Sequence, residues 1–167
     1  PYIATNPIGS IIDSGVGIVN YRGWGNAEGW HYPEYYVDDI NALSNGKMLP
    51  IMTSIVCGTG DFGSWGFDPC FGEAWIRSGS PIALKGGPAM CAPSDFDTHT
   101  RWNNAVGSGF YQGLLREGMD HFGQAMLRAK LEVWNWFVDE RGPDDWVDYY
   151  FNVYNILGDP ELWVRTA

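Results

Sequence analysis

The chemistry that the sequence suggests centres on Cys57, which ends the apolar run Leu49–Cys57 and precedes a glycine-rich turn at 58–60. A second apolar run, Val16–Tyr21, precedes a similar turn at 23–25. Buried parallel strands read as continuous apolar runs, and their carboxyl ends meet at the sheet edge where α/β proteins bind ligands. Glycine turns at that edge bring backbone N–H groups close to a substrate carbonyl. The pattern indicates either a cysteine nucleophile at a cleft or an inert core thiol.

The rest of the sequence predicts helices that alternate with these strands. Apolar residues recur at helical spacing in several stretches. We expect helices capped by Asp38, over Phe71–Arg77, over Trp102–Leu114, over Phe122–Phe137 and from Asp145 to Leu157. Pro81–Leu84 predicts a third strand, and Glu161–Arg165 predicts a final edge strand. This alternation predicts an α/β sandwich with a mainly parallel sheet.

The composition excludes several classes of protein. The 167 residues carry a net charge of −10 with no basic cluster, so we expect no nucleic-acid partner. No apolar run reaches the roughly 18 residues of a membrane helix, so we expect no membrane insertion. The 9 Trp, 9 Tyr and 8 Phe can anchor the core of one compact domain over residues 1–167. Three irregularly spaced cysteines fit neither a disulfide framework nor a zinc site, and we expect no required cofactor.

Three segments carry a family resemblance: VNYRGWGNAEGWHYP, SIVCGTGDFGSWGFDPCFGEAW and YNILGDPELWVRT. Together they resemble the gingipain-type cysteine peptidases, peptidase family C25 of the caspase-like clan, from about Val16 to Arg165. Members of this family carry a Gly-His-Gly turn, a nucleophilic Cys, a Cys-Phe-Gly-Glu helix start and a closing Leu-Gly-Asp-Pro. The matching residues here are Gly23, Gly25, Cys57, Cys70–Glu73 and Leu157–Pro160. The resemblance implies a caspase-like three-layer sandwich.

The resemblance also implies roles for particular residues. Cys57 becomes the nucleophile, and the backbone N–H groups of Gly25 and Cys57 form the oxyanion hole. The catalytic His of the family falls on Trp24, whose indole has an N–H donor and no basic nitrogen. An ordinary thiol is only a few per cent thiolate at neutral pH, and losing a positioned acid and base costs roughly 10²–10⁴ in rate. We therefore expect a catalytically degenerate peptidase, with Cys57 at the cleft and Cys70 buried under its helix.

Two alternatives stay open. An active cysteine endopeptidase can use His31 or His99 as a substitute base, although each also fits an ordinary solvated loop histidine. The chain can instead be a scaffold that binds a peptide or a glycan in the old cleft. Trp24 then offers a stacking surface, whereas otherwise it fills the pocket that the His has vacated. The loop aromatics that suit such binding are Trp24, Trp30, Tyr32, Trp65 and Phe67.

The resemblance further implies a setting for the protein. The family is typically secreted by the bacterial type IX system, so we expect an extracellular or cell-surface location. Family domains have further strands before the Gly-His-Gly turn, so we expect a carboxyl-terminal portion of the domain with an incomplete sheet. Its first strand would expose a long apolar edge unless the remainder of a larger polypeptide, or another chain, covers it. Structural calcium, which gingipain-like domains often bind, has loop carboxylates available at Asp61, Asp68, Asp95 and Asp97, without a regular ligand spacing.

Overall fold

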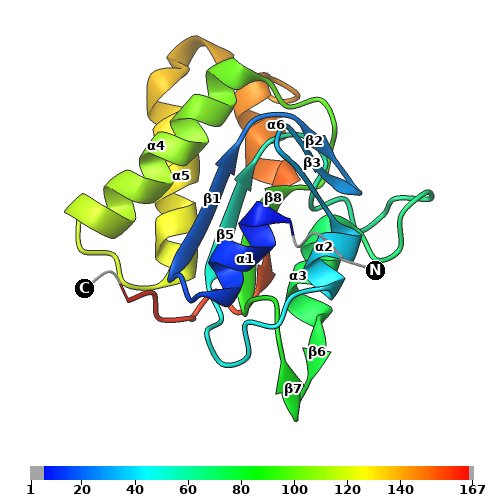
Figure 1. Ribbon diagram of the computed structural model, residues 1–167. Coiled ribbons are helices and arrows are strands. Elements are labelled where there is room, and N and C mark those ends of the chain that lie inside the picture. The colour runs from blue at the N-terminus through cyan, green and yellow to red at the C-terminus, as the bar shows by residue number, and fades with distance from the viewer. Residues whose placement is uncertain (1–5, 166–167) are drawn as a thin grey trace.

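A four-stranded sheet forms the centre of the computed structural model, which describes residues 6–165 (Figure 1). Its strands are β1 (Ile18–Arg22), β5 (Ile51–Ile55), β8 (Ala89–Pro93) and β9 (Tyr154–Gly158), in the order β1-β5-β8-β9. The first three are parallel, and β9 is antiparallel to β8. The two strands expected from the apolar runs are confirmed. Residues 1–5 and 166–167 of the expected domain lie outside the described part.

Helices cover both faces of this sheet, which makes a three-layer sandwich (Figure 1). One face carries α4 (Thr100–Arg116), α5 (Phe122–Trp136) and α6 (Trp146–Val153), and the other carries α1 (Pro7–Asp13), α2 (Val37–Asn41) and α3 (Phe71–Arg77). Successive residues of β5 alternate between the two cores. Ile51 and Ile55 pack into the first core, whereas Met52 and, just beyond the strand, Val56 pack into the second. All five residues of β5 are buried, and its two polar members, Thr53 and Ser54, have hydrogen-bond partners for their hydroxyls.

Short elements complete the described structure. Three strands after β1 form an antiparallel sheet: β2 (Gly25–Asn26), β3 (Gly29–His31) and β4 (Glu34–Tyr36). Strands β6 (Gly79–Ser80) and β7 (Ala83–Leu84) form a hairpin that projects from the body, and the 3₁₀ helix η1 (Val138–Glu140) follows α5 (Figure 1). Within residues 6–165, no helix combines the length and the apolar character that crossing a membrane requires.

The third strand of the main sheet lies elsewhere than expected. Pro81–Leu84 forms part of the exposed β6–β7 hairpin, where Ile82 is 98% exposed. The place in the sheet belongs to β8, whose residues are all buried. Its sequence AMCAP is dominated by small residues because large side chains such as Phe110 and Phe122 fill the adjoining core. Apolar bulk was therefore a misleading signal at this position.

The carboxyl-terminal prediction is wrong in two places. The helix expected from Asp145 to Leu157 ends at Val153, and the chain continues directly as β9. Tyr154 and Leu157 fit the helical period, yet they face the core from a strand that pairs with β8. The expected edge strand Glu161–Arg165 contributes only an isolated bridge between Trp163 and His121.

The other helices are confirmed with small changes at their ends. Helix α3 spans Phe71–Arg77 as expected, and α4 and α5 cover the two long periodic stretches. Asp38 does not cap α2, because the helix already begins at Val37. Its first turn is instead closed by Asp39, whose carboxylate accepts from the backbone N–H of Tyr36 at 2.8 Å.

Strand β1 forms an edge of the sheet among the residues that the structure describes, because it pairs only with β5. The edge is less apolar than expected. Asn20 and Arg22 are exposed, Tyr21 is buried, and Ile18 and Val19 are half-buried. The expectation of a long apolar edge is therefore wrong, since polar side chains alternate along the strand.

Candidate active site

A cleft of about 410 Å³ opens at the carboxyl ends of β1 and β5. Its walls come from the loop after β1, the loop after β5, and the segment that leads from β8 into α4. The lining residues are Arg22, Gly23, Trp24, Cys57, Phe96, Thr98, His99, Thr100, Asn103 and Asn104. The structure thus brings together Cys57, Trp24 and His99, three of the residues selected from the sequence.

Cys57 is half-buried in this cleft, two residues beyond the end of β5. Its Sγ donates to the backbone carbonyl of Thr98, 3.2 Å away. Thr98 is itself held in place, because its hydroxyl donates to the carbonyl of Val56 at 2.8 Å. A carbonyl oxygen accepts a hydrogen bond but is not a base, so this contact does not provide a proton acceptor for catalysis.

Backbone hydrogen bonds hold the turn after Cys57 against its neighbours. The N–H of Gly58 donates to Asp95 at 2.8 Å, and that of Gly60 donates to Pro93 at 2.9 Å. Gly58 has φ +58°, a conformation that favours glycine, and a Cβ there would lie 2.7 Å from the Phe96 ring. The turn therefore requires its glycine, and it fixes the position of the thiol.

A buried chain of side-chain hydrogen bonds lies beneath the same turn. The indole of Trp30 donates to the hydroxyl of Ser54 at 2.9 Å, and the hydroxyls of Ser54 and Thr59 lie 2.8 Å apart. Trp30 is on β3, Ser54 is on β5, and Thr59 is in the turn. The chain thus connects the small sheet, the central strand and the turn that follows Cys57.

Gly25 packs directly behind the turn. A Cβ at this position would lie 3.0 Å from Val56 Cγ2, 3.1 Å from Thr59 Cγ2 and 2.8 Å from the carbonyl oxygen of Gly29. Only glycine therefore lets the two loops approach this closely. The oxyanion role of the Gly25 and Cys57 N–H groups stays a prediction.

Trp24 stands on the rim of the cleft with 70% of its surface exposed. The expectation that it fills a vacated pocket is therefore wrong. Its backbone is held while its ring is free, because its carbonyl accepts from the Tyr21 hydroxyl at 3.1 Å and from the His31 N–H at 2.9 Å. The indole is placed as a surface on which a ligand can stack.

The two candidate bases occupy different places. His99 is exposed and lines the cleft, with its ring centroid 5.2 Å from that of Trp146 and 6.1 Å from that of Trp102. His31 lies on β3, stacked edge-on against Tyr32 at 6.5 Å, and does not line the cleft. Of these two, only His99 shares a cavity with Cys57.

The loop aromatics do not form one surface. Tyr32 is 77% exposed, Trp65 is fully exposed and Phe67 is 37% exposed, but none of them lines the cleft. Trp30 is 2% exposed and belongs to the core, so its expected binding role is wrong. Trp24 is the member of the set that reaches the cleft, where Phe96 joins it.

Sequence reasoning missed Asn103 and Arg22. Asn103 is 2% exposed, and its Oδ1 accepts from the hydroxyls of Tyr150 at 3.0 Å and Tyr154 at 2.6 Å. A polar residue on the apolar face of α4 was the signal that could have revealed it. Arg22 is the last residue of β1. A charged residue directly after an apolar run was the signal that could have revealed it.

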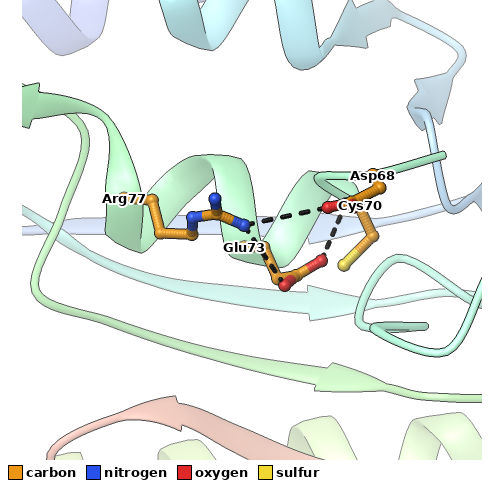
Figure 2. Close-up of polar contacts among 4 residues, drawn as sticks. All are labelled: Asp68, Cys70, Glu73 and Arg77. Carbon is orange, nitrogen blue, oxygen red and sulfur yellow. Dashed lines mark hydrogen bonds and ion pairs between the residues drawn. The ribbon is translucent and has the colours of Figure 1, made fainter.

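Cys70 precedes α3 and is fully buried, as expected. The carboxylate of Glu73 accepts from the backbone N–H of Cys70 at 3.0 Å (Figure 2). The Arg77 guanidinium lies 3.5 Å from the same carboxylate and 3.9 Å from that of Asp68. Burial raises the pKa of Cys70 to about 11 and that of the fully buried Cys91 to about 12. Both thiols remain protonated at neutral pH.

We expect iodoacetamide to alkylate Cys57 before Cys70 and Cys91 in the native protein. The thiol of Cys57 lines an open cleft, whereas the other two are buried and protonated. Mass spectrometry of a time course at pH 7.5 checks the order, with the denatured protein as the control in which all three react alike. Earlier alkylation of Cys70 would contradict this placement.

The expected calcium ligands do not form a cluster. Among residues 6–165, no group of three or more His, Cys, Asp and Glu side chains is placed to hold a metal ion. Calcium binding by Asp61, Asp68, Asp95 or Asp97 stays a prediction.

Comparisons with known proteins agree with this geometry. The sequence profile of peptidase family C25 matches residues 3–165. Gingipain R2 and gingipain R1 of Porphyromonas gingivalis are each 30% identical over 172 residues, covering 99% of this chain but 22% and 16% of those proteins. The chain therefore spans less than a quarter of the length of these relatives.

Solved structures share the fold. The crystal structure of the Arg specific cysteine proteinase gingipain R has a TM-score of 0.84 at 22% identity, over 99% of this chain and 37% of that chain. The complex of Porphyromonas gingivalis RgpB pro- and mature domains gives 0.85 at 20% identity, over 99% and 38%. The expected caspase-like sandwich, as part of a larger domain, is confirmed.

Proposed function

Because the chain belongs to peptidase family C25, we propose that it forms the carboxyl-terminal portion of a gingipain-like domain whose cleft binds peptides without efficiently hydrolysing them. The observation that carries this proposal is the position of Trp24. It stands on the rim of the cleft that holds Cys57, and the sequence resemblance puts the His of the family motif at this position. The nucleophile and the turn that holds it are retained, and the base is replaced.

The chemistry explains why this replacement silences hydrolysis. A base must take the proton of the thiol during attack, and the same group must hand a proton to the leaving amine. The Trp24 indole has no basic nitrogen, and the Cys57 Sγ donates to the Thr98 carbonyl instead. Losing a positioned acid and base costs roughly 10²–10⁴ in rate. The peptide-binding surface does not depend on that proton transfer.

An active cysteine endopeptidase is the second candidate, and the place of His99 favours it. His99 lines the same cleft as Cys57, whereas His31 does not. Catalysis would require an imidazole nitrogen of His99 within about 3 Å of the sulfur. Its ring instead contacts Trp146 and Trp102, and its backbone N–H donates to the Tyr150 hydroxyl at 2.8 Å.

Alkylation rates of Cys57 between pH 5 and 9 distinguish these two candidates in the intact protein. We expect His99→Ala and His31→Ala to leave the rate profile of the parent unchanged, because neither imidazole activates the thiol. His31→Ala serves as the matched control outside the cleft. Loss of alkylation near neutral pH in His99→Ala alone would replace the degenerate peptidase by the active one.

The setting of the protein is also proposed here. The chain covers 37% and 38% of the two matched gingipain structures, so we propose that a larger polypeptide supplies the rest of the domain. Strand β1, one of the two edges of the sheet in the described residues, is a place where further strands can join it. By its family we expect the protein to be secreted to the cell surface or beyond through the type IX system.

A further inference from the structure

The cleft that holds Cys57 differs in charge from the chain as a whole. The chain carries 20 Asp and Glu against 10 Lys and Arg, for a net charge of −10. The ten residues that line the cleft include no Asp or Glu, but they include Arg22 and the titratable His99. A cationic cleft in an acidic chain favours a ligand group of negative charge.

Arg22 is fixed in this cleft although it is exposed. Its Nη1 donates to the carbonyl of Ile55 at 3.2 Å, and its Nη2 donates to the carbonyl of Thr100 at 3.1 Å and to Asn104 Oδ1 at 3.2 Å. All three acceptors are neutral, and Arg22 forms no ion pair with any of the described residues 6–165. A guanidinium has five N–H donors, so two remain for a ligand.

Two acidic residues are sequence neighbours of the cleft-lining residue Phe96. Asp95 and Asp97 flank Phe96 on the cleft wall, but neither lines the cleft. Burial, followed by the charges of Asp95 and Asp97, raises the pKa of Tyr149 on α6. Asp95 Oδ1 accepts from the backbone N–H of Asp97 at 3.2 Å, and among the described residues neither carboxylate pairs with Arg22, so the charge of Arg22 is left for a ligand.

Other lining groups suit a carboxylate on an extended chain. Asn104 uses its Oδ1 to accept from Arg22, so its amide N–H donors remain for a ligand. Trp24 and Phe96 are 70% and 51% exposed on the rim, where they can pack against peptide side chains. The cleft thus combines a fixed cation, an amide donor and two aromatic surfaces.

We propose that this cleft binds peptides through a carboxylate held by Arg22 and Asn104, supplied by an Asp or Glu side chain or by the peptide's carboxyl terminus. A Lys or Arg side chain in the same place meets the Arg22 guanidinium with no carboxylate in the lining to offset the repulsion. The inference rests on the proposed function, since it takes the cleft to bind peptides. It adds the class of peptide that is bound.

Fluorescently labelled alanine pentapeptides with a central Glu, Gln or Lys test this inference in the intact protein. All three carry amidated carboxyl termini, and a fourth peptide combines a central Gln with a free terminal carboxylate. By fluorescence anisotropy at low salt, we expect the Glu peptide to bind at least about tenfold more tightly than the Lys peptide. A gain by the fourth peptide alone identifies the terminal carboxylate as the source, and it supports the inference equally.

Arg22 variants and salt then assign the preference to this residue. We expect Arg22→Gln to abolish the preference and Arg22→Lys to keep part of it, because lysine retains the charge and loses the planar fork. Arg116→Gln removes an exposed charge from the far end of α4 and should change nothing. In the unmutated protein, about 0.5 M salt should reduce the preference for the Glu peptide over the Lys peptide severalfold.

The outcomes separate this inference from the proposed function. Equal binding of the Glu, Gln, Lys and free-carboxylate peptides overturns the carboxylate preference and leaves peptide binding intact. A preference that resists salt, or that persists in a folded Arg22→Gln variant, overturns the assignment to Arg22. If none of the four peptides binds, both the inference and the peptide-binding function are overturned.

Discussion

Trp24→His should raise the alkylation rate of Cys57 near neutral pH by about tenfold or more, because an ordinary thiol is only a few per cent thiolate there and full ionisation raises that fraction by roughly thirtyfold at most. An imidazole at this position can take the thiol proton and stabilise the thiolate as an ion pair. The fold should tolerate the change, because the indole is 70% exposed and its removal leaves no buried cavity. The backbone that carries residue 24 stays held through its carbonyl by Tyr21 and His31.

Rates of iodoacetamide alkylation at pH 5 to 9 check this expectation in the parent, Trp24→His and Trp24→Ala. The alanine variant is the matched control, since it exposes the thiol equally without supplying a base. Cleavage of a mixed peptide library then reports whether hydrolysis has returned. Equal rates in the histidine and alanine variants would show that an imidazole at residue 24 does not activate Cys57.

Gly109→Ala should destabilise the fold by about 1–3 kcal/mol, the usual cost of overpacking a filled core. Helices α4 and α5 are in backbone contact at this glycine. A Cβ there would lie 2.5 Å from Glu132 Cβ, 2.8 Å from Ala129 Cα and 2.9 Å from the carbonyl oxygen of Arg128. Two of these three are backbone atoms, so the helices must move apart to relieve the clash.

Gly107→Ala is the matched control, two residues earlier on the same helix. Its nearest neighbour would be Ile55 Cγ1 at 3.9 Å, an ordinary contact. Replacing a helical glycine by alanine there should stabilise the fold by roughly 0.5–1 kcal/mol through helix propensity. Denaturant titrations of the two variants should therefore shift in opposite directions. Parallel shifts would refute the close approach of α4 and α5.

The sequence was sufficient to predict the part of the site that depends on strand ends. Cys57 and Trp24 each follow a short, mostly apolar run, and neighbouring parallel strands place their loops together. His99 was selected only as one of two histidines. Its position depends on where α4 begins relative to β8, and the residue types of the segment between them do not predict that arrangement.

The remaining errors arise where long-range packing decides local structure. Strand β8 is built from small residues, because the side chains packed on it leave little room, and it lacks the apolar bulk of a typical buried strand. Tyr154 fits a helical period, but pairing with β8 turns it into a strand residue. Arg22 and Asn103 become visible as cleft residues only when β1, β5 and α4 are assembled.

The hydrogen-bonded chain from Trp30 through Ser54 to Thr59 bears on how this domain can evolve. These three side chains are buried, so the fold itself requires them whether or not the protein cleaves anything. The same bonds hold the turn that presents Cys57. Selection for a stable core therefore preserves the geometry of the turn at Cys57 without any selection for hydrolysis. Residue 24 is under no such constraint from packing, because it lies on the exposed rim, where a substitution costs the fold little.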